Sequence, residues 1–423
     1  MTQGRRLPLR DRAWLEVETI RVIGPLMSVT APALRQTLVA VHADHPGHRV
    51  VCRLDRAGGR WLPIGRRDIE AYCDETVLET TTGGPDAGHA IMRKLLAHPL
   101  GDHPLVFAVG GGYVGIKISH AFGDARILGA WQPELVRAAA AGTRAQLPGP
   151  DSSTRLPLLR GALLQFARSP GRIGRAFRVG RRPAPPPSAS APAPWRPDPV
   201  HRYTRVTPAA LTRLRQWRDA EAPGVSVTTI LLAAIPVALT RCGVGAQPDG
   251  LVMLIDARRY LPPGSVIDGN FCWGQYLHPT DPTDPRAVQD TLKEEIASGR
   301  PLGMLILRQA SLLLGRGGHS TVPTTVPTEV RPELTVSSSG RLETYEDLPW
   351  AAGPDGRESI TVATPAGPPA ITVSVDELSG TLHLTAVFHG STFDAEAVRR
   401  AMDLVGADPV GLVSSAGGQP VAG

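Results

Sequence analysis

The part of the chain best suited to chemistry is a short segment in which His120 follows an apolar run and Asp124 stands four residues later. The apolar run predicts a strand over residues 113–119, and Asp124 can cap a following helix, so His120 is expected on the turn between them. An imidazole has an ordinary pKa of about 6.5, so a positioned histidine can take a proton from a hydroxyl or amine as it attacks a carbonyl. The pair therefore suits acyl transfer. Its spacing is also common by chance, and a capping aspartate needs no catalytic histidine.

Other chemical motifs are absent or misplaced. Residues 110–115 match G-x-G-x-x-G, but dinucleotide binding requires a helix after the glycines, and here strands are expected on both sides. A glycine-rich hairpin turn is the interpretation. His42, His45 and His48 have ligand-like spacing, but Pro46 interrupts the helix that would align them, so no metal site is predicted. The sequence has no G-x-S-x-G, Walker or H-E-x-x-H motif, which disfavours common hydrolases, phosphate-loop enzymes and zinc peptidases.

The elements that must position His120 are strands and helices mixed in both halves of the chain, which indicates an α/β fold. The predicted strands are residues 49–54, 105–109, 113–119 and 251–255, with a hairpin of residues 371–375 and 382–388. The predicted helices are residues 32–41, 208–218, 227–239, 287–297 and 394–404, the last capped by Asp394.

The length of 423 residues predicts one large two-lobed unit or two domains. Hydrophobic residues make up 42% and charged residues 20%, so most of the chain can form a core. The strongest break in composition begins with six arginines in residues 168–182 and continues with eight prolines in residues 183–199. Such a stretch favours an exposed connector between lobes. The predicted organisation is an N-terminal lobe (1–167), this linker (168–200), a C-terminal lobe (201–409) and a flexible tail (410–423).

Cysteine content and charge restrict the environment. The cysteines are scattered without a C-x-x-C pair, as expected for a reducing compartment rather than a disulfide framework; they are Cys52, Cys73, Cys242 and Cys272. The N-terminus has no apolar core of a secretory signal, and no apolar run reaches the roughly 18 residues that span a bilayer. A cytoplasmic protein without a membrane span is predicted. The net charge of +6 and the 5% aromatic content favour a mixed solvated surface over a nucleic-acid partner.

The sequence around His120 resembles a known family motif. VGIKISHAFGDARIL at residues 114–128 is similar to the HxxxD motif, often HHxxxDG, of the chloramphenicol-acetyltransferase-like, coenzyme A-dependent acyltransferases. That superfamily includes nonribosomal peptide condensation domains, wax ester synthases, polyketide-associated acyltransferases and plant BAHD enzymes. HPGHR at residues 45–49 is similar to its HPxLR, and HPLGDHPLV at residues 98–106 resembles the stretch ahead of the motif strand.

The second half of the chain continues the resemblance. IDARRYLP at residues 255–262, followed by DGNF at residues 268–271, is similar to the family's vdlRrrlp…GNF passage. The resemblance covers residues 20–405 approximately, and the order and spacing of its pieces are more specific than any single piece. It implies two similar α/β sandwich lobes in a V-shaped pseudo-dimer around a central tunnel, with the histidine at the centre.

The resemblance also implies roles for individual residues. His120 would be the general base that deprotonates an acceptor, which then attacks a thioester carbonyl. Asp124 would turn away from the imidazole and pair with an arginine of the second lobe, for which Arg258 is the candidate and Arg259 the alternative. No cofactor would be bound, because acyl-CoA or a phosphopantetheinyl thioester serves as substrate.

Further substrate contacts are assigned on the same basis. The candidates for the oxyanion contact are three consecutive serines, Ser337, Ser338 and Ser339. A serine-rich surface turn is the alternative for them. Ser119 replaces the first histidine of the HH form, and Ala125 replaces the glycine after the aspartate. Trp273 is expected in the core or in the tunnel wall.

These observations predict an acyltransferase or condensing enzyme that moves an acyl group from a coenzyme A or carrier-protein thioester to a small-molecule hydroxyl or amine, in secondary-metabolite or lipid biosynthesis. The arginines of residues 168–182 could meet an acidic carrier protein or the phosphates of coenzyme A, with a solvated linker as the alternative. Ser119 and Ala125 motivate a second hypothesis, a catalytically silent, condensation-like docking protein for an acyl carrier protein. Epimerisation is a third.

Overall fold

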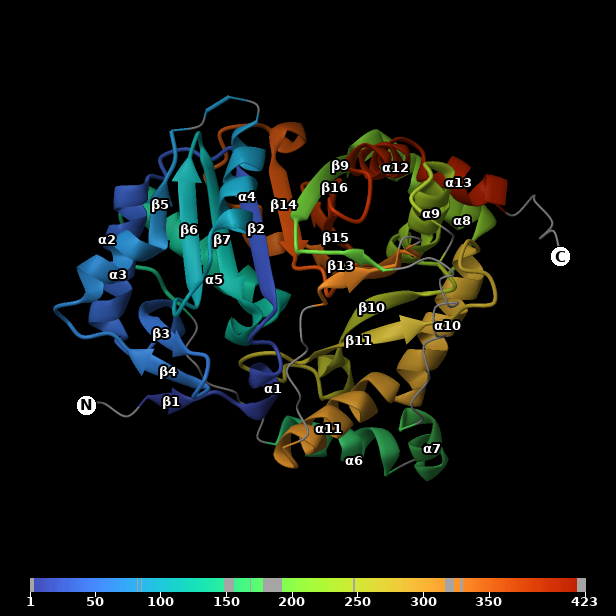
Figure 1. The fold of residues 1–423 in the computed structure, drawn as a ribbon, viewed down its shortest axis with the longest axis horizontal. Helices are drawn as coiled ribbons and strands as arrows, with labels where there is room; N and C mark the ends of the chain where they lie inside the picture. The colour runs from blue at the N-terminus through green and yellow to red at the C-terminus, as the bar shows by residue number, and fades with distance from the viewer. Residues whose placement is uncertain are drawn as a thin grey trace.

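The computed structural model describes residues 4–81, 83–84, 86–147, 156–167, 169–177, 192–245, 248–315, 323–327 and 330–416. The chain forms two lobes, each built on a β-sheet with helices packed against it (Figure 1). In Figure 1 the first lobe is blue to cyan and the second runs mainly from green to red. This two-lobed arrangement confirms the predicted α/β fold class.

The first lobe contains a five-stranded sheet in the order β14–β2–β7–β6–β5. These strands are β14 (Glu358–Ala363), β2 (Glu18–Gly24), β7 (Tyr113–Ser119), β6 (Leu105–Gly110) and β5 (Val77–Glu79). Side chains alternate between the faces of a strand, so Phe107 packs in one core of this lobe and Val106 in another. Helices α2 (Ala31–Asp44), α3 (Ile69–Thr76) and α5 (Ala125–Ala141) cover the face of Phe107, and α4 (Ala87–Ala97) covers the other.

A smaller layer precedes the site in the sequence. It is a three-stranded sheet of β1 (Arg5–Arg6), β4 (Arg60–Pro63) and β3 (Cys52–Asp55). Helix α1 (Leu9–Arg12) follows β1 and contacts the turn that holds His120. The start of the chain is therefore placed beside the candidate active site.

The second lobe contains a six-stranded sheet in the order β11–β10–β13–β15–β16–β9. These strands are β11 (Cys272–Leu277), β10 (Leu251–Asp256), β13 (Glu333–Arg341), β15 (Ala370–Leu378), β16 (Thr381–His389) and β9 (Pro199–Val206). Its helices are α8 (Pro208–Glu221), α9 (Val227–Arg241), α10 (Pro285–Ser298), α11 (Arg300–Leu313), α12 (Ala395–Ala407) and α13 (Pro409–Ala416). Helix α9 is buried from Thr229 to Leu239 and forms the centre of this core.

Each lobe takes part of its structure from the other half of the sequence. Strand β14 pairs antiparallel with β2, with Thr361 opposite Arg21, so it completes the first sheet although it belongs to the second half of the chain (Figure 1). Conversely, α6 (Pro157–Phe166) and α7 (Ile173–Ala176) pack on α11. The predicted boundaries of 1–167 and 201–409 therefore do not separate two independent sets of elements.

A buried polar network joins the lobes beside β14. Arg21 donates hydrogen bonds to Thr361 Oγ1, Tyr345 Oη and Ser339 Oγ, each at 3.0 Å, and lies 3.5 Å from Asp376 of β15. Arg21 and Asp376 are each 1% exposed. An unpaired charge at this depth would be costly, so the lobes are held in one relative position.

The glycine-rich segment is the predicted hairpin turn. Strands β6 and β7 pair antiparallel, and Gly111 and Gly112 connect them with φ of 57° and 81°. Two consecutive positive φ values are the requirement of a tight primed turn, and glycine meets it without strain. Because a strand follows these glycines, the segment lacks the helix that would receive a pyrophosphate.

Three local predictions were wrong. Residues 410–416 are not a flexible tail, because they continue α13, whose Leu412 and Val413 are buried in the second core; residues 417–423 lie outside the described part. Arg49 and the next two residues form a 3₁₀ turn before β3 rather than the start of a strand. The serines 337–339 lie within β13 rather than in a turn: Ser337 and Ser338 pair with β15, and Ser339 falls at a shift of register in the same strand. Of the predicted linker, residue 168 and residues 178–191 lie outside the described residues.

Candidate active site

A strand, a 3₁₀ turn and a helix position His120. Strand β7 ends at Ser119, and His120 opens the turn, held by a 2.7 Å hydrogen bond from its backbone N–H to the carbonyl of Val17. Gly123 then has φ of 149°, and a Cβ atom there would lie 2.7 Å from Ile127. The next residue, Asp124, caps α5 by accepting the backbone N–H of Arg126 at 3.3 Å. The predicted location of His120 on a turn between strand and helix is confirmed.

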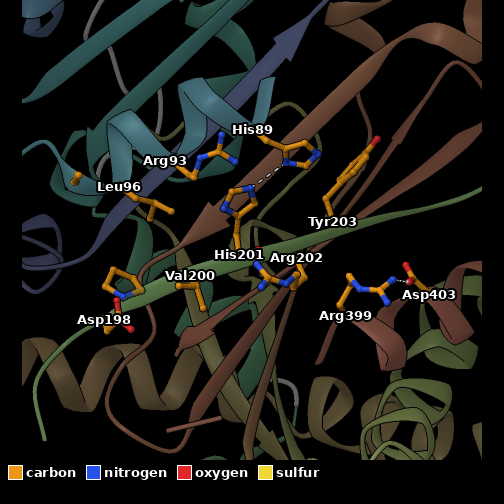
Figure 2. Close-up of a pocket in the computed structure, with 12 residues that line it drawn as sticks. His89, Arg93, Leu96, Asp198, Val200, His201, Arg202, Tyr203, Arg399 and Asp403 are labelled. Atoms are coloured by element: carbon orange, nitrogen blue, oxygen red, sulfur yellow. Dashed lines mark hydrogen bonds and ion pairs between the residues drawn. The ribbon is translucent and has the colours of Figure 1, made fainter. Parts of the chain in front are cut away.

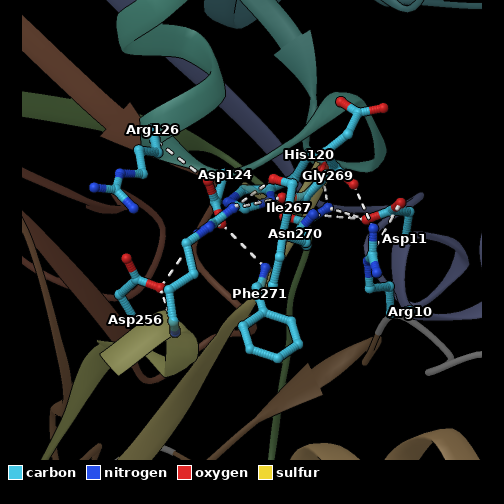
Figure 3. Close-up of polar contacts among 12 residues, drawn as sticks. Arg10, Asp11, His120, Asp124, Arg126, Asp256, Ile267, Gly269, Asn270 and Phe271 are labelled. Carbon is cyan, nitrogen blue, oxygen red and sulfur yellow. Dashed lines mark hydrogen bonds and ion pairs between the residues drawn. The ribbon is translucent and has the colours of Figure 1, made fainter. Parts of the chain in front are cut away.

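Asp124 is bonded to the second lobe and not to the imidazole (Figure 3). Arg258 Nη1 donates to Asp124 Oδ2 at 2.7 Å, and the same oxygen accepts the backbone N–H of Phe271 at 3.0 Å. Arg258 Nη2 also donates to the carbonyls of Gly269 and Ile267, at 2.9 and 3.2 Å. The structure thus brings Asp124 together with Arg258. Both residues also bind the backbone of residues 267–271, so the pair holds that loop in place. Arg259, the alternative partner, is exposed.

His120 is enclosed, and its two ring nitrogens differ in their hydrogen bonds. Its Nδ1 lies 2.7 Å from Oδ1 of Asn270, and its ring stacks on Trp14 with centroids 4.5 Å apart and planes inclined by 22°. Within the described part of the chain, Nε2 has no hydrogen-bond partner. Burial lowers the pKa of His120, and the negative charge of Asp124 partly opposes that effect. The imidazole is therefore kept neutral, which is the form that can accept a proton.

Sequence reasoning missed three residues of this site. Asn270 was noted only within the DGNF passage, but its side chain is 2% exposed and contacts His120 directly. Asp11, also 2% exposed, accepts both the backbone and the side-chain N–H of Asn270. Trp14 covers the ring face. Asp11 and Trp14 come from a polar N-terminal segment without a recognisable pattern, so no local signal could have identified them.

The HPxLR-like segment also reaches the site. Arg49 Nη1 donates to the carbonyl of Phe122 at 2.6 Å, and its guanidinium lies 4.7 Å from the ring centroid of Trp131. It also forms an ion pair with Asp268, in the loop that precedes Gly269. Burial lowers the pKa of Arg49 to about 10. Arg49 therefore contacts both the turn that holds His120 and the loop that carries Asn270, as Arg258 does from the second half of the chain.

The remaining candidates lie farther from the imidazole. Ser119 is buried and donates to the carbonyl of Leu15 at 3.3 Å. Ser339 accepts from Arg21, and Ser338 accepts the N–H of Gly340 at 3.4 Å. Within the described residues, no hydrogen bond joins His120 to these serines or to Ser337. Strands β10 and β13 run parallel with Met253 beside Val336, so the serines lie at the end of the sheet that leads to Arg258.

Two cavities have different relations to His120. A small one of about 20 Å³ is lined by Asn270, Trp14 and Trp273, so the structure brings Trp273 to the site. A tunnel through this point stays a prediction. A larger cavity of about 680 Å³ lies between α4, β9 and α12 and is lined by other residues, among them His89 and His201 (Figure 2). The two imidazoles are bonded, with Nδ1 of His89 3.0 Å from Nε2 of His201.

The described part of the chain contains neither a metal-binding cluster nor a membrane-spanning helix. There, no group of three or more His, Cys, Asp or Glu side chains could hold a metal ion. None of the helices described is long and apolar enough to cross a membrane. Of the arginine run, Arg172 and Arg175 are exposed on and before α7, while Arg168, Arg178, Arg181 and Arg182 lie outside the described residues.

Comparison with known proteins finds similar folds among solved structures. No protein-family model matches the chain, and no curated protein does. Among solved structures, a trichothecene 15-O-acetyltransferase from Fusarium sporotrichioides matches with a TM-score of 0.58 at 11% identity, over 94% of this chain and 90% of the other. The epimerization domain of the third module of tyrocidine synthetase B matches with a TM-score of 0.57 at 12% identity, over 97% of both chains. Polyketide synthase associated protein 5 from Mycobacterium tuberculosis gives 0.53 at 17% identity, over 95% and 98%.

The chain therefore shares the two-lobed fold of this acetyltransferase, this epimerization domain and this polyketide synthase associated protein, which is the fold that the sequence resemblance predicts. The matches cover nearly the full length of the chain and of these three structures. They include an acetyltransferase and an epimerization domain, so the fold alone does not select the reaction.

Proposed function

We propose that this chain is an acyltransferase or condensing enzyme that moves an acyl group from a coenzyme A or carrier-protein thioester to a hydroxyl or amine. The observation that carries the proposal is the state of His120. Its Nδ1 is bonded to Asn270, its ring is stacked on Trp14, and Nε2 has no partner among the described residues. A neutral imidazole held in this way is suited to general-base catalysis.

The proposed reaction proceeds through addition and elimination at the thioester carbonyl. Nε2 of His120 takes the proton of the acceptor hydroxyl or amine as its oxygen or nitrogen bonds to the carbonyl carbon. The tetrahedral intermediate then collapses, the carbon–sulfur bond breaks, and the leaving thiolate takes the proton from Nε2. The products are an ester or amide and a free thiol, and His120 returns to its neutral form.

The other site residues have supporting roles in this proposal. Asp124 and Arg258 hold the motif turn against the second lobe rather than contact substrate. The serines 337–339 stay candidates for the oxyanion contact, supported by their location at the end of β13 that leads toward Arg258. The exposed Arg172 and Arg175 are candidates for contact with an acidic carrier protein or coenzyme A phosphates. A cytoplasmic location stays a prediction.

The test is release of free thiol from a panel of acyl-CoA and acyl-pantetheine donors with mixed alcohol and amine acceptors. We expect acceptor-dependent release by the wild type and a loss of roughly 100-fold or more in His120→Ala. The matched control is His278→Ala, because His278 is exposed just after β11 and, among the described residues, its side chain has a single hydrogen bond, to the carbonyl of Asp249. It should react at the wild-type rate.

Two outcomes would contradict the proposal. If His120→Ala releases thiol as fast as the wild type, His120 is not the base. If wild type and variant are equally inert on every donor but bind a loaded carrier protein, the chain is a docking protein and not an enzyme.

A further inference from the structure

We propose that Asp11 and Asn270 are positioning residues that fix the proton of His120 on Nδ1 and so leave Nε2 as the base. Figure 3 shows Asn270 between Asp11 of the first lobe and His120. The proposal rests on the proposed acyl transfer for its purpose, because that reaction needs Nε2 unprotonated. Its geometry can be tested without any substrate.

The first step is the orientation of the Asn270 amide, which its neighbours determine. Nδ2 lies 2.8 Å from the carbonyl oxygen of His120 and 2.9 Å from Oδ1 of Asp11. A carbonyl oxygen can only accept, and Asp11 Oδ1 already accepts the backbone N–H of Asn270 at 2.8 Å. If the Asn270 amide were rotated by 180°, its oxygen would face the carbonyl oxygen of His120 and Oδ1 of Asp11, and no hydrogen bond could form. The NH₂ group therefore faces them, and the amide oxygen faces the imidazole.

The second step is the proton on His120. An amide oxygen can only accept, and it lies 2.7 Å from Nδ1, so Nδ1 carries the hydrogen. In a neutral ring the other nitrogen then has a lone pair and no hydrogen. All polar groups of the Asn270 side chain are used in this arrangement: two N–H donors and one accepting oxygen. No second arrangement satisfies them as well.

The third step is the rigidity of the support. Gly269 has φ of 103°, and a Cβ atom there would lie 2.5 Å from the carboxylate of Asp11, so the loop fits closely over that side chain. On its other side the loop is held by Arg258 and by the bond from Phe271 to Asp124. Asp11 and His120 belong to the first lobe and Asn270 to the second. The tautomer of His120 therefore depends on a contact between the two lobes.

The experiment measures the tautomer directly. In protein labelled with ¹⁵N at histidine, long-range ¹H–¹⁵N spectra distinguish a ring nitrogen that carries hydrogen from one that does not, and His120→Gln assigns the signal. We expect hydrogen on Nδ1 and none on Nε2 in the wild type. Asn270→Ala removes the acceptor and should give a mixture of tautomers. Asp11→Ala should shift the population in the same direction, whereas the isosteric Asp11→Asn, whose amide oxygen can still accept, should keep the wild-type signal.

The kinetic readout separates positioning from folding. For variants with the melting temperature of the wild type, Asn270→Ala should lower kcat by about 10–100-fold with KM for the donor unchanged. Hydrogen on Nε2 in the wild type, or an Asn270→Ala or Asp11→Ala spectrum identical to the wild type, would overturn the proposal. If the spectra are as expected but no donor reacts, the proposed function fails and the positioning by Asp11 and Asn270 stands.

Discussion

Arg258 lies 2.7 Å from Asp124, and the two residues, which are 134 positions apart in the sequence, are both buried where the lobes meet. The aspartate of the motif is thus a structural partner of the second lobe. Within 3.2 Å the same guanidinium also contacts two carbonyls of the loop that carries Asn270. One ion pair therefore supports both the turn of His120 and the residue that holds its Nδ1.

Removing both members of this pair should cost less than the sum of the costs of removing each one alone. Arg258→Ala leaves Asp124 buried and unpaired, so we expect the free energy of unfolding to fall by about 3–5 kcal/mol. The double variant with Asp124→Ala should lose less than the sum of the two single variants. Urea unfolding measures both values. Arg259→Ala, at an exposed neighbouring position, is the control and should change stability by about 0.5 kcal/mol or less. Additive effects would contradict the coupling.

Gly269→Ala should impair folding and activity more than a backbone effect explains. Gly269 and Gly264 both have positive φ, but a Cβ atom at Gly264 would have no neighbour within 4 Å. Gly264→Ala therefore measures the cost of left-handed backbone alone, roughly 1–2 kcal/mol. Gly269→Ala adds a clash with the buried Asp11 and should be less stable than Gly264→Ala in denaturant titration, with slower thiol release. Equal stability of the two variants would show that the loop is not tightly fitted.

The pH dependence of the reaction should reflect the burial of His120. Its lowered pKa keeps the base neutral at pH values where an ordinary histidine is charged. The acidic limb of the kcat/KM profile should therefore have its midpoint below about pH 6.5. A profile of thiol release from pH 5 to pH 8 checks this expectation. An acidic limb above that value would mean that the imidazole is stabilised in its charged form.

Stability should decrease in acid because of two other histidines. Burial lowers the pKa of His201 to about 3 and that of His383 to about 4. In the unfolded chain both histidines titrate near pH 6.5. Between about pH 6.5 and pH 4 the unfolded state therefore binds more protons than the folded state, and lowering the pH favours unfolding. We expect the melting temperature to fall as pH decreases through this window. His383→Gln should flatten that dependence, whereas His278→Gln, at an exposed position, should not. A melting temperature independent of pH in this window would contradict the burial effect.

The sequence was informative where the signal is local. The apolar run and the capping aspartate placed His120 and Asp124 correctly, because a strand, a turn and a helix cap are decided by neighbouring residues. The resemblance to the vdlRrrlp passage selected Arg258, which the structure brings to Asp124. The strand-like segments 371–375 and 382–388 likewise predicted the hairpin of β15 and β16.

The rest depends on contacts between distant segments. Asp11 has no pattern around it, and its role comes from a loop 259 positions away. Strand β14 was not predicted, and no feature of its six residues tells which sheet it joins. The serines 337–339 suggested a turn by composition, but Ser337 and Ser338 pair with β15 and keep the segment in a strand.

Because β14 belongs to the first sheet, that sheet cannot be completed early in the synthesis of the nascent chain. Strands β2 and β7 emerge early, but the partner of β2 is not complete until residue 363 has been synthesised. At about 5–20 residues per second, the outer side of β2 stays unpaired for on the order of tens of seconds. An unpaired strand can recruit another nascent chain, and a charge within it opposes such pairing. Arg21, at the middle of β2, places such a charge on the strand while it is unpaired, and in the folded chain the same residue is the buried link between the lobes.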